Sequence, residues 1–159
     1  MHIFRMTRIF TVQGDSMEQS LSDGDVLIVN RLATGRATVR RGDVVVTRVS
    51  GQPGRHFVKR VVALPGECLS LQDGLLLIDD NHFPEPYLNG LPAYLGTGNH
   101  SWQIGEDEYF LMGDNRVHST DSRDYGPVAQ EALVGRISRR IWPPARWGTF
   151  EYASLMFGL

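Results

Sequence analysis

The sequence alternates between short runs of β-branched or aromatic residues and turn sequences rich in glycine, proline and aspartate. Runs of this kind, bounded by turn residues, are typical of β-strands. No segment keeps a 3.6-residue apolar period over a long window, so we expect only short helices, at Ser16–Leu21 and Val128–Leu133. The expected strands are Val26–Val29, Val44–Val49, Phe57–Leu64, Leu75–Ile78, Tyr109–Met112 and Val134–Ile141.

These strands predict a mostly β protein in which antiparallel sheets form a sandwich or a partly closed barrel. Residues 67–107 contain more proline, glycine and asparagine than the segments on either side, and we interpret them as a smaller β insert. Residues 1–66 and 108–159 would then form one β core that carries the chemistry. A chain of 159 residues can bury about two-thirds of its unfolded surface, so this fold requires neither a disulfide nor a metal.

Composition and charge exclude several classes of function. The formal net charge is −2, which disfavours a broad cationic face for nucleic acid. Cys68 is the only cysteine and the five histidines are scattered without ligand spacing, so we expect no metal site and no cofactor. Arg5 and Arg8 interrupt the apolar N-terminal segment, and no apolar run approaches the roughly 18–20 residues that span a bilayer.

Lys59 is the only lysine among 16 basic residues, and all the others are arginine. Codon preference explains most of this imbalance, but a guanidinium cannot replace an amine that must lose its proton. On a strand, Lys59 shares a face with Phe57, Val61 and Ala63, and burial among apolar side chains lowers a lysine pKa. Lys59 is therefore either a general base or a lysine whose stem packs while its amine reaches water.

Two further stretches carry groups that are suited to catalysis. Within residues 11–21, an apolar run ends at Gly14 and Ser16 follows, which places a hydroxyl at a strand end beside free backbone N–H groups. The alternative is that Ser16 merely caps a short helix. Residues 113–128 follow an expected strand and are rich in charged and hydroxyl side chains, as in a loop that positions active-site groups or in a solvated turn.

In their order and spacing, these three stretches resemble the type I signal peptidases, membrane proteases with a Ser–Lys catalytic pair. The resemblance covers residues 11–148, nearly the whole chain. The residues that resemble boxes of the family are Val12-x-Gly14-x-Ser16-Met17, Gly24-Asp25 with the Val26–Val29 that follows, Arg41-Gly42-Asp43-Val44-Val45-Val46, Lys59-Arg60-Val61-Val62-Ala63-Leu64-Pro65-Gly66-Glu67 and Gly113-Asp114-Asn115-Arg116-x-x-Ser119-x-Asp121-Ser122-Arg123-x-x-Gly126-x-Val128. Glu85-Pro86-Tyr87-Leu88-Asn89 and Trp142-Pro143-Pro144 are also similar to the family.

The resemblance implies a serine endopeptidase that removes signal peptides from secreted preproteins after small residues of the Ala-x-Ala kind. Ser16 would be the nucleophile and Lys59 its general base. Met17 would line the shallow substrate pockets, and the Ser16 backbone N–H would hold the oxyanion. The supporting groups would be Ser119, which hydrogen-bonds the Lys59 amine, the Asp121–Arg123 ion pair, and Asp114, which helps to hold the loop.

The chain also departs from the family pattern. Some members carry a hydroxyl side chain where this chain has Gly14, so a second oxyanion donor is absent or comes from elsewhere. Gln19-Ser20 stands in place of the usual Pro-Thr.

The family has a transmembrane helix before the nucleophile box and acts on the extracytoplasmic face of the membrane. No such segment precedes Ser16, which predicts either a missing anchor or a soluble or peripheral form. The residues expected to touch a membrane surface are Ile3, Phe4, Ile9, Phe10 and the apolar tail Tyr152–Leu159.

Three alternative hypotheses remain open at this stage. The first is a soluble Ser–Lys relative, either a maturation protease with one dedicated substrate or an autoprotease of the SOS-repressor kind, although no room for a DNA-binding domain precedes Ser16. The second is a serine hydrolase that uses His118 as its base. The third is a non-catalytic β binding module derived from the protease. Substitution of Lys59 and of His118 separates these hypotheses.

Overall fold

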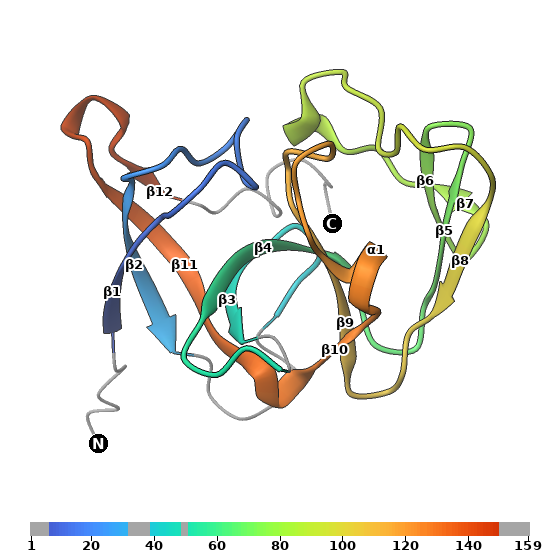
Figure 1. The fold of residues 1–159 in the computed structure, drawn as a ribbon, viewed down its shortest axis with the longest axis horizontal. Coiled ribbons are helices and arrows are strands. Elements are labelled where there is room, and N and C mark those ends of the chain that lie inside the picture. The colour runs from blue at the N-terminus through green and yellow to red at the C-terminus, as the bar shows by residue number, and fades with distance from the viewer. Residues whose placement is uncertain (1–6, 32–38, 49–50, 150–159) are drawn as a thin grey trace.

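The computed structural model describes residues 7–31, 39–48 and 51–149, which form two antiparallel β-sheets (Figure 1). The larger sheet has eight strands, in the order β1-β2-β11-β3-β4-β9-β10 with β12 paired to β11. Its strands are β1 (Thr7–Thr11), β2 (Val26–Arg31), β3 (Val44–Arg48), β4 (His56–Ala63), β9 (Glu108–Met112), β10 (Val128–Ala129), β11 (Leu133–Trp142) and β12 (Gly148–Thr149).

The smaller sheet has four strands in the order β7-β6-β5-β8, and it lies at the right-hand end of the molecule in Figure 1. Its strands are β5 (Cys68–Gln72), β6 (Leu75–Ile78), β7 (Asn81–His82) and β8 (His100–Gln103). All four lie within residues 67–107. Helical turns are short: α1 (Ser122–Tyr125) and the 3-10 turns η2 (Pro86–Leu88), η3 (Gln130–Ala132) and η4 (Pro144–Arg146).

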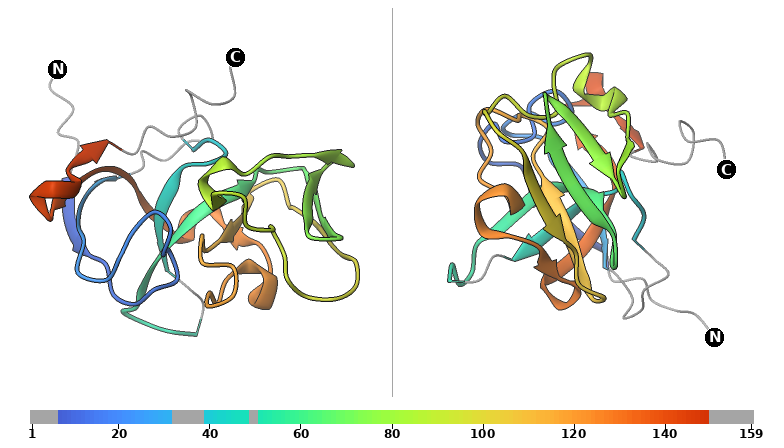
Figure 2. Two further views of the ribbon diagram at one scale, coloured as in Figure 1. Left: turned by 90° about the horizontal axis from the view of Figure 1, so that it is seen from above. Right: turned by 90° about the vertical axis from the view of Figure 1, so that its right-hand side faces the viewer.

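Buried apolar side chains hold each sheet and join the two. The curl of the larger sheet, visible from above in Figure 2, encloses a cluster that includes Met17, Leu27 and Val44. A second cluster joins the sheets, because Phe110 and Met112 of β9 pack in one core with side chains of β5 and β6. The smaller sheet is therefore fixed against the strands that lead into the loop after β9.

The predicted fold class is confirmed, because the described residues are mostly antiparallel β-structure with few helices. All six predicted strands are present: Leu75–Ile78 has the predicted bounds, and the other five differ by one or two residues at one or both ends. Strand β1 and most of the smaller sheet were not predicted. In the smaller sheet, strands such as His100–Gln103 lack the β-branched residues on which the prediction depended.

Both predicted helices are wrong. Residues 16–20 form consecutive turns, in which Gln19 takes a φ of +99°, outside the helical region. Val128–Leu133 divides into strand β10 and the 3-10 turn η3. Among the described residues, no helix is long and apolar enough to cross a membrane. Ile3, Phe4 and the tail Tyr152–Leu159 lie outside the described residues.

Candidate active site

The structure brings Ser16 and Lys59 together from segments 43 residues apart. Lys59 lies in the middle of β4, where it pairs with Val45 of β3, and its side chain is only 1% exposed. Its Nζ lies 2.8 Å from Ser16 Oγ, a hydrogen-bond distance. The same Nζ lies 5.9 Å from the centre of the Phe57 ring, on the face of the strand that the alternation predicts.

Burial lowers the pKa of Lys59, because the charged ammonium loses its hydration. The carboxylate of Asp121 opposes this effect and the guanidinium of Arg123 adds to it. Within the described part of the chain, Lys59 forms no ion pair, and its hydrogen-bond partner is the neutral hydroxyl of Ser16. A neutral amine beside a hydroxyl is the arrangement that a general base requires.

The turn that carries Ser16 is held by its own backbone and by the loop after β9. Leu21 N–H donates to Met17 O at 2.8 Å, and Gly14 N–H donates to the Asp23 carboxylate at 2.8 Å. Asn115 bridges to the turn twice, from its backbone N–H to Ser16 O and from its amide to Asp15 O, both at 3.1 Å. The loop therefore holds the peptide group that precedes Ser16 and the peptide group that follows it.

Met17 lies beneath this turn. Its side chain is 1% exposed and packs with Val12, Leu21 and other core residues. It was expected to line the substrate pockets, but it contributes no open surface here because the turn folds its side chain inward. No described residue accepts a hydrogen bond from the Ser16 N–H, and Gly14 has no side chain that could add a second donor beside it.

Asp121 and Arg123 form the predicted ion pair, with both guanidinium contacts at 2.8 Å. Asp121 is also the N-cap of α1 and accepts from Gly113 N–H at 2.9 Å. Burial raises the pKa of the Asp121 carboxyl, but the ion pair and the Gly113 N–H outweigh it, so the pKa lies below its ordinary value. Asp121 is thus a fixed negative charge that faces Lys59.

Ser119 does not make the expected hydrogen bond to the Lys59 amine. Its Oγ is buried and has no hydrogen-bond partner, although it approaches the Asp121 carboxylate closely enough to favour the charged form. The side chain lies directly against Gly113: a Cβ added there would stand 2.2 Å from Ser119 Oγ and 2.4 Å from Ser16 O. Gly113 therefore allows the approach of Ser119 to the nucleophile turn.

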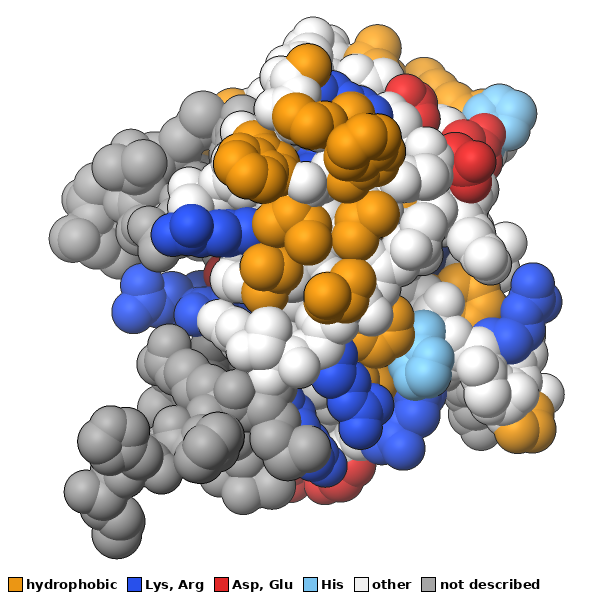
Figure 3. Space-filling model, turned by 90° about the vertical axis from the view of Figure 1, so that its left-hand side faces the viewer, with side chains coloured by type: hydrophobic (Ala, Val, Ile, Leu, Met, Phe, Trp, Pro, Cys, Tyr) orange, Lys and Arg blue, Asp and Glu red, His pale blue; other side chains and the backbone are white. Residues whose placement is uncertain are grey.

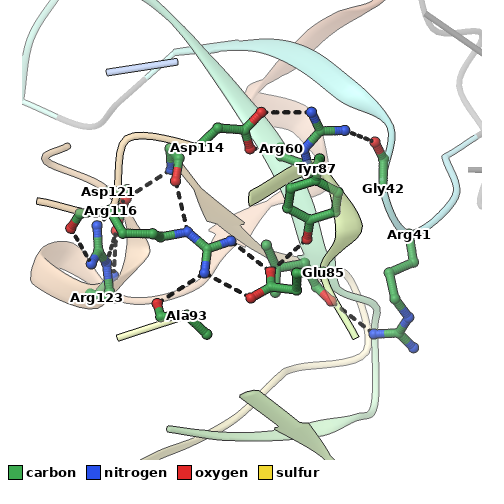
Figure 4. Close-up of polar contacts among 12 residues, drawn as sticks. Arg41, Gly42, Arg60, Glu85, Tyr87, Ala93, Asp114, Arg116, Asp121 and Arg123 are labelled. Carbon is green, nitrogen blue, oxygen red and sulfur yellow. Dashed lines mark hydrogen bonds and ion pairs between the residues drawn. The ribbon is translucent and has the colours of Figure 1, made fainter. Parts of the chain in front are cut away.

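Asp114 holds the loop through a buried ion pair that the sequence analysis missed. Arg60 Nε and a terminal nitrogen donate to the Asp114 carboxylate at 2.8 and 2.6 Å (Figure 4). Ser20 Oγ donates to the same carboxylate at 2.6 Å. Arg60 also donates to Gly42 O at 2.7 Å. The signal was available: a charged residue between Val58 and Val62 in a buried run requires a carboxylate partner.

Two further features bear on the chemistry of the site: the ring of His118 and a possible metal site. His118 is exposed, and its hydrogen bonds are donated by its backbone N–H to Asn115, so its ring does not engage Ser16 in this arrangement. Among the described residues, no group of three or more His, Cys, Asp or Glu side chains is placed to hold a metal ion.

Comparison with known proteins identifies the family of the chain. The family model described as "Signal peptidase, peptidase S26" matches residues 1–142. Signal peptidase I V of Bacillus subtilis is 31% identical over 141 residues, which cover 81% of this chain and 82% of the relative. Signal peptidase I of Bacillus caldolyticus is 32% identical over 145 residues, covering 84% and 79% of the two chains.

A solved structure gives the same result at the level of the fold. The crystal structure of a signal peptidase I from Enterococcus faecalis superposes with a TM-score of 0.55 and 28% sequence identity, and covers 64% of this chain and 97% of that one. Family match, relatives and fold agree over most of the chain. The protein is therefore a serine endopeptidase that belongs to the S26 family of signal peptidases.

Proposed function

We propose that this protein cleaves signal peptides from secreted preproteins with Ser16 as nucleophile and Lys59 as general base. The observation that carries the proposal is the 2.8 Å contact between Ser16 Oγ and a buried Lys59 amine that has no carboxylate partner among the described residues. Burial lowers the pKa of Lys59, which raises the fraction of neutral amine near pH 7.

The reaction follows from this contact. As Ser16 Oγ attacks the scissile carbonyl carbon, neutral Lys59 takes the hydroxyl proton, and the Ser16 N–H stabilises the developing oxyanion. Lys59 then returns a proton to the leaving amine, which departs as the new N-terminus of the mature protein. Water attacks the acyl-enzyme ester with Lys59 again as base, and Ser16 regains its proton when the carboxylate product leaves.

The other predicted site residues take supporting roles in this proposal. Asp121, paired with Arg123, fixes the field around Lys59, and Asp114 ties the loop to β4 through Arg60. Ser119 orients the Lys59 amine in this proposal, since its buried Oγ has no hydrogen-bond partner among the described residues. Met17 supports the Ser16 turn from beneath, because its side chain is buried there.

We also propose that the face carrying β1, β2, β11 and β12 lies against the extracytoplasmic surface of a membrane. Ile9, Trp142 and Trp147 are 67%, 56% and 68% exposed, which is unusual for such large apolar side chains. Figure 3 shows apolar side chains gathered on this face, with basic side chains beside them. Tryptophan favours the membrane interface, and arginine binds anionic lipid headgroups.

The catalytic proposal is tested with a peptide that carries Ala-x-Ala before the cut, assayed in lipid vesicles. Lys59→Arg and Ser16→Ala are expected to abolish cleavage, whereas His118→Ala retains it. An active Lys59→Arg variant together with an inactive His118→Ala variant would sink the Ser–Lys assignment.

For the membrane face, co-sedimentation with anionic vesicles is expected to weaken in a Trp142→Ser, Trp147→Ser double variant that cleaves the free peptide at the wild-type rate.

A further inference from the structure

The segment between β7 and β8 of the smaller sheet contacts the loop after β9 through a buried ion pair. The Glu85 carboxylate accepts from both terminal nitrogens of Arg116, at 2.9 and 2.6 Å, and each side chain is only 3% exposed (Figure 4). The Tyr87 hydroxyl donates to the same carboxylate at 2.5 Å, and its ring lies 4.0 Å from the Arg60 guanidinium. Residues 85–87 therefore contact both buried arginines next to the site.

The arginine held by Glu85 is connected to the candidate catalytic centre by short contacts. Arg116 Nε donates to Gly113 O at 2.9 Å, and Gly113 N–H donates to Asp121 at 2.9 Å. Asp121 is the charge that acts most strongly on the Lys59 amine. Gly113 is also the residue against which the Ser119 side chain and the Ser16 carbonyl both lie. The backbone conformation of Gly113, whose N–H and carbonyl belong to two successive peptide units, thus affects the counter-charge of Lys59 and the nucleophile turn.

The charge of Arg116 explains why a carboxylate is needed at position 85. A guanidinium keeps its proton, so Arg116 remains charged although it is buried, and its environment raises its pKa further. Without Glu85, the buried cation would lose its two strong hydrogen bonds and turn toward Asp114, the next carboxylate in its surroundings. That movement would withdraw Nε from Gly113 O.

We propose that Glu85, oriented by Tyr87, is a positioning residue for the Ser16–Lys59 pair, so that the smaller sheet helps to set the geometry of catalysis. The inference rests on the proposed function of that pair. Glu85 lies outside the three stretches that carry the proposed catalytic groups, and it acts through Arg116 and Gly113 rather than by contact with substrate.

The test is Glu85→Gln, which keeps the shape of the side chain and removes its charge. We expect kcat to fall about 10- to 100-fold with KM within twofold of the wild type, because a misplaced catalytic group affects the chemical step. The matched control is Glu67→Gln. Glu67 also pairs with an arginine, Arg41, between the smaller sheet and the core, but this pair does not contact the loop after β9. Glu67→Gln is expected to lose stability and to keep kcat.

A second variant and a second measurement keep the test decisive. Arg116→Lys retains the charge opposite Glu85 but removes the Nε–H that holds Gly113 O, and it should lower kcat as Glu85→Gln does. Hydrogen–deuterium exchange of residues 113–125 should quicken in Glu85→Gln and stay unchanged in Glu67→Gln. The exchange measurement tests the inference even if the wild type cleaves no peptide. Absence of cleavage would count against the proposed function but not against the link between Glu85 and the loop. Unchanged exchange in Glu85→Gln, or wild-type kcat in folded Glu85→Gln or Arg116→Lys, would overturn the inference.

Discussion

Replacement of Gly113 by alanine should damage catalysis far more than folding. An added Cβ would lie 2.4 Å from Ser16 O and 2.5 Å from Ser119 Cβ, whereas ordinary contact begins at 3.4 Å. The Ser16 carbonyl, the Ser119 side chain or Gly113 itself must therefore move by about 1 Å, because these atoms are closely packed. Overpacking of this kind costs about 1–3 kcal/mol of stability. A shift of about 1 Å in a reacting group costs about 100-fold in rate.

The assay is kcat for cleavage of the Ala-x-Ala peptide, with thermal unfolding measured on the same samples. Gly135→Ala is the matched control, because its Cβ would meet Val29 at 2.6 Å and Asn30 O at 2.7 Å, away from Ser16. It should lose similar stability and keep kcat per folded molecule. Gly148→Ala has nothing within 4 Å and should change neither quantity. If Gly113→Ala kept kcat within twofold while Gly135→Ala lost the expected stability, the steric reasoning would be refuted.

Three other expectations follow from the same site. First, kcat/KM should rise as pH increases and Lys59 loses its proton, with a midpoint below the ordinary lysine value of 10.5 because burial lowers this pKa; a midpoint at or above 10.5 would contradict it. Second, burial raises the pKa of Asp121, but the ion pair with Arg123 lowers it more, so the folded-state pKa lies below 3.8. The ionised Asp121 therefore stabilises the fold above pH 3.8, and this stabilisation is lost as the pH falls below that value. Urea unfolding of the Asp121→Asn variant should not show this loss at low pH. Third, Gln19→Gly should raise stability by about 1 kcal/mol in thermal melts, because Gln19 has a φ of +99°.

The strands of the larger sheet were predictable because they bury β-branched runs such as Val44–Val46. The turn at residues 16–20 was not, because its geometry comes from distant partners. Ser20 donates to Asp114, 94 residues away, and Asn115 N–H binds Ser16 O. Local propensity contains no information about such contacts.

The candidate site was likewise predictable only in part from the sequence. The alternation around Lys59 predicted a side chain on an apolar strand face but left open whether its amine reaches water, and the structure buries the amine against Ser16. The partner of Arg60 could not be assigned from the sequence. Residues 114–124 contain five charged side chains, carboxylates and arginines, and the sequence does not favour one pairing over another. Glu85 was unassignable for the same reason, since only the packing of the smaller sheet brings it to Arg116.

The distribution of partners among the buried cations explains why the single lysine stands at position 59. Each arginine near the site has its own carboxylate: the buried Arg60 and Arg116 pair with Asp114 and Glu85, and the partly buried Arg123 pairs with Asp121. Lys59 is equally buried, but within the described residues its hydrogen-bond partner is the hydroxyl of Ser16. A carboxylate in contact would stabilise the ammonium and raise its pKa, as Asp121 does weakly from a distance. Arginine in that position would keep its proton whatever its surroundings. In the proposed mechanism the arginines therefore supply fixed charge that orders the loop, and Lys59, which has no carboxylate partner among the described residues, is the basic group whose proton moves.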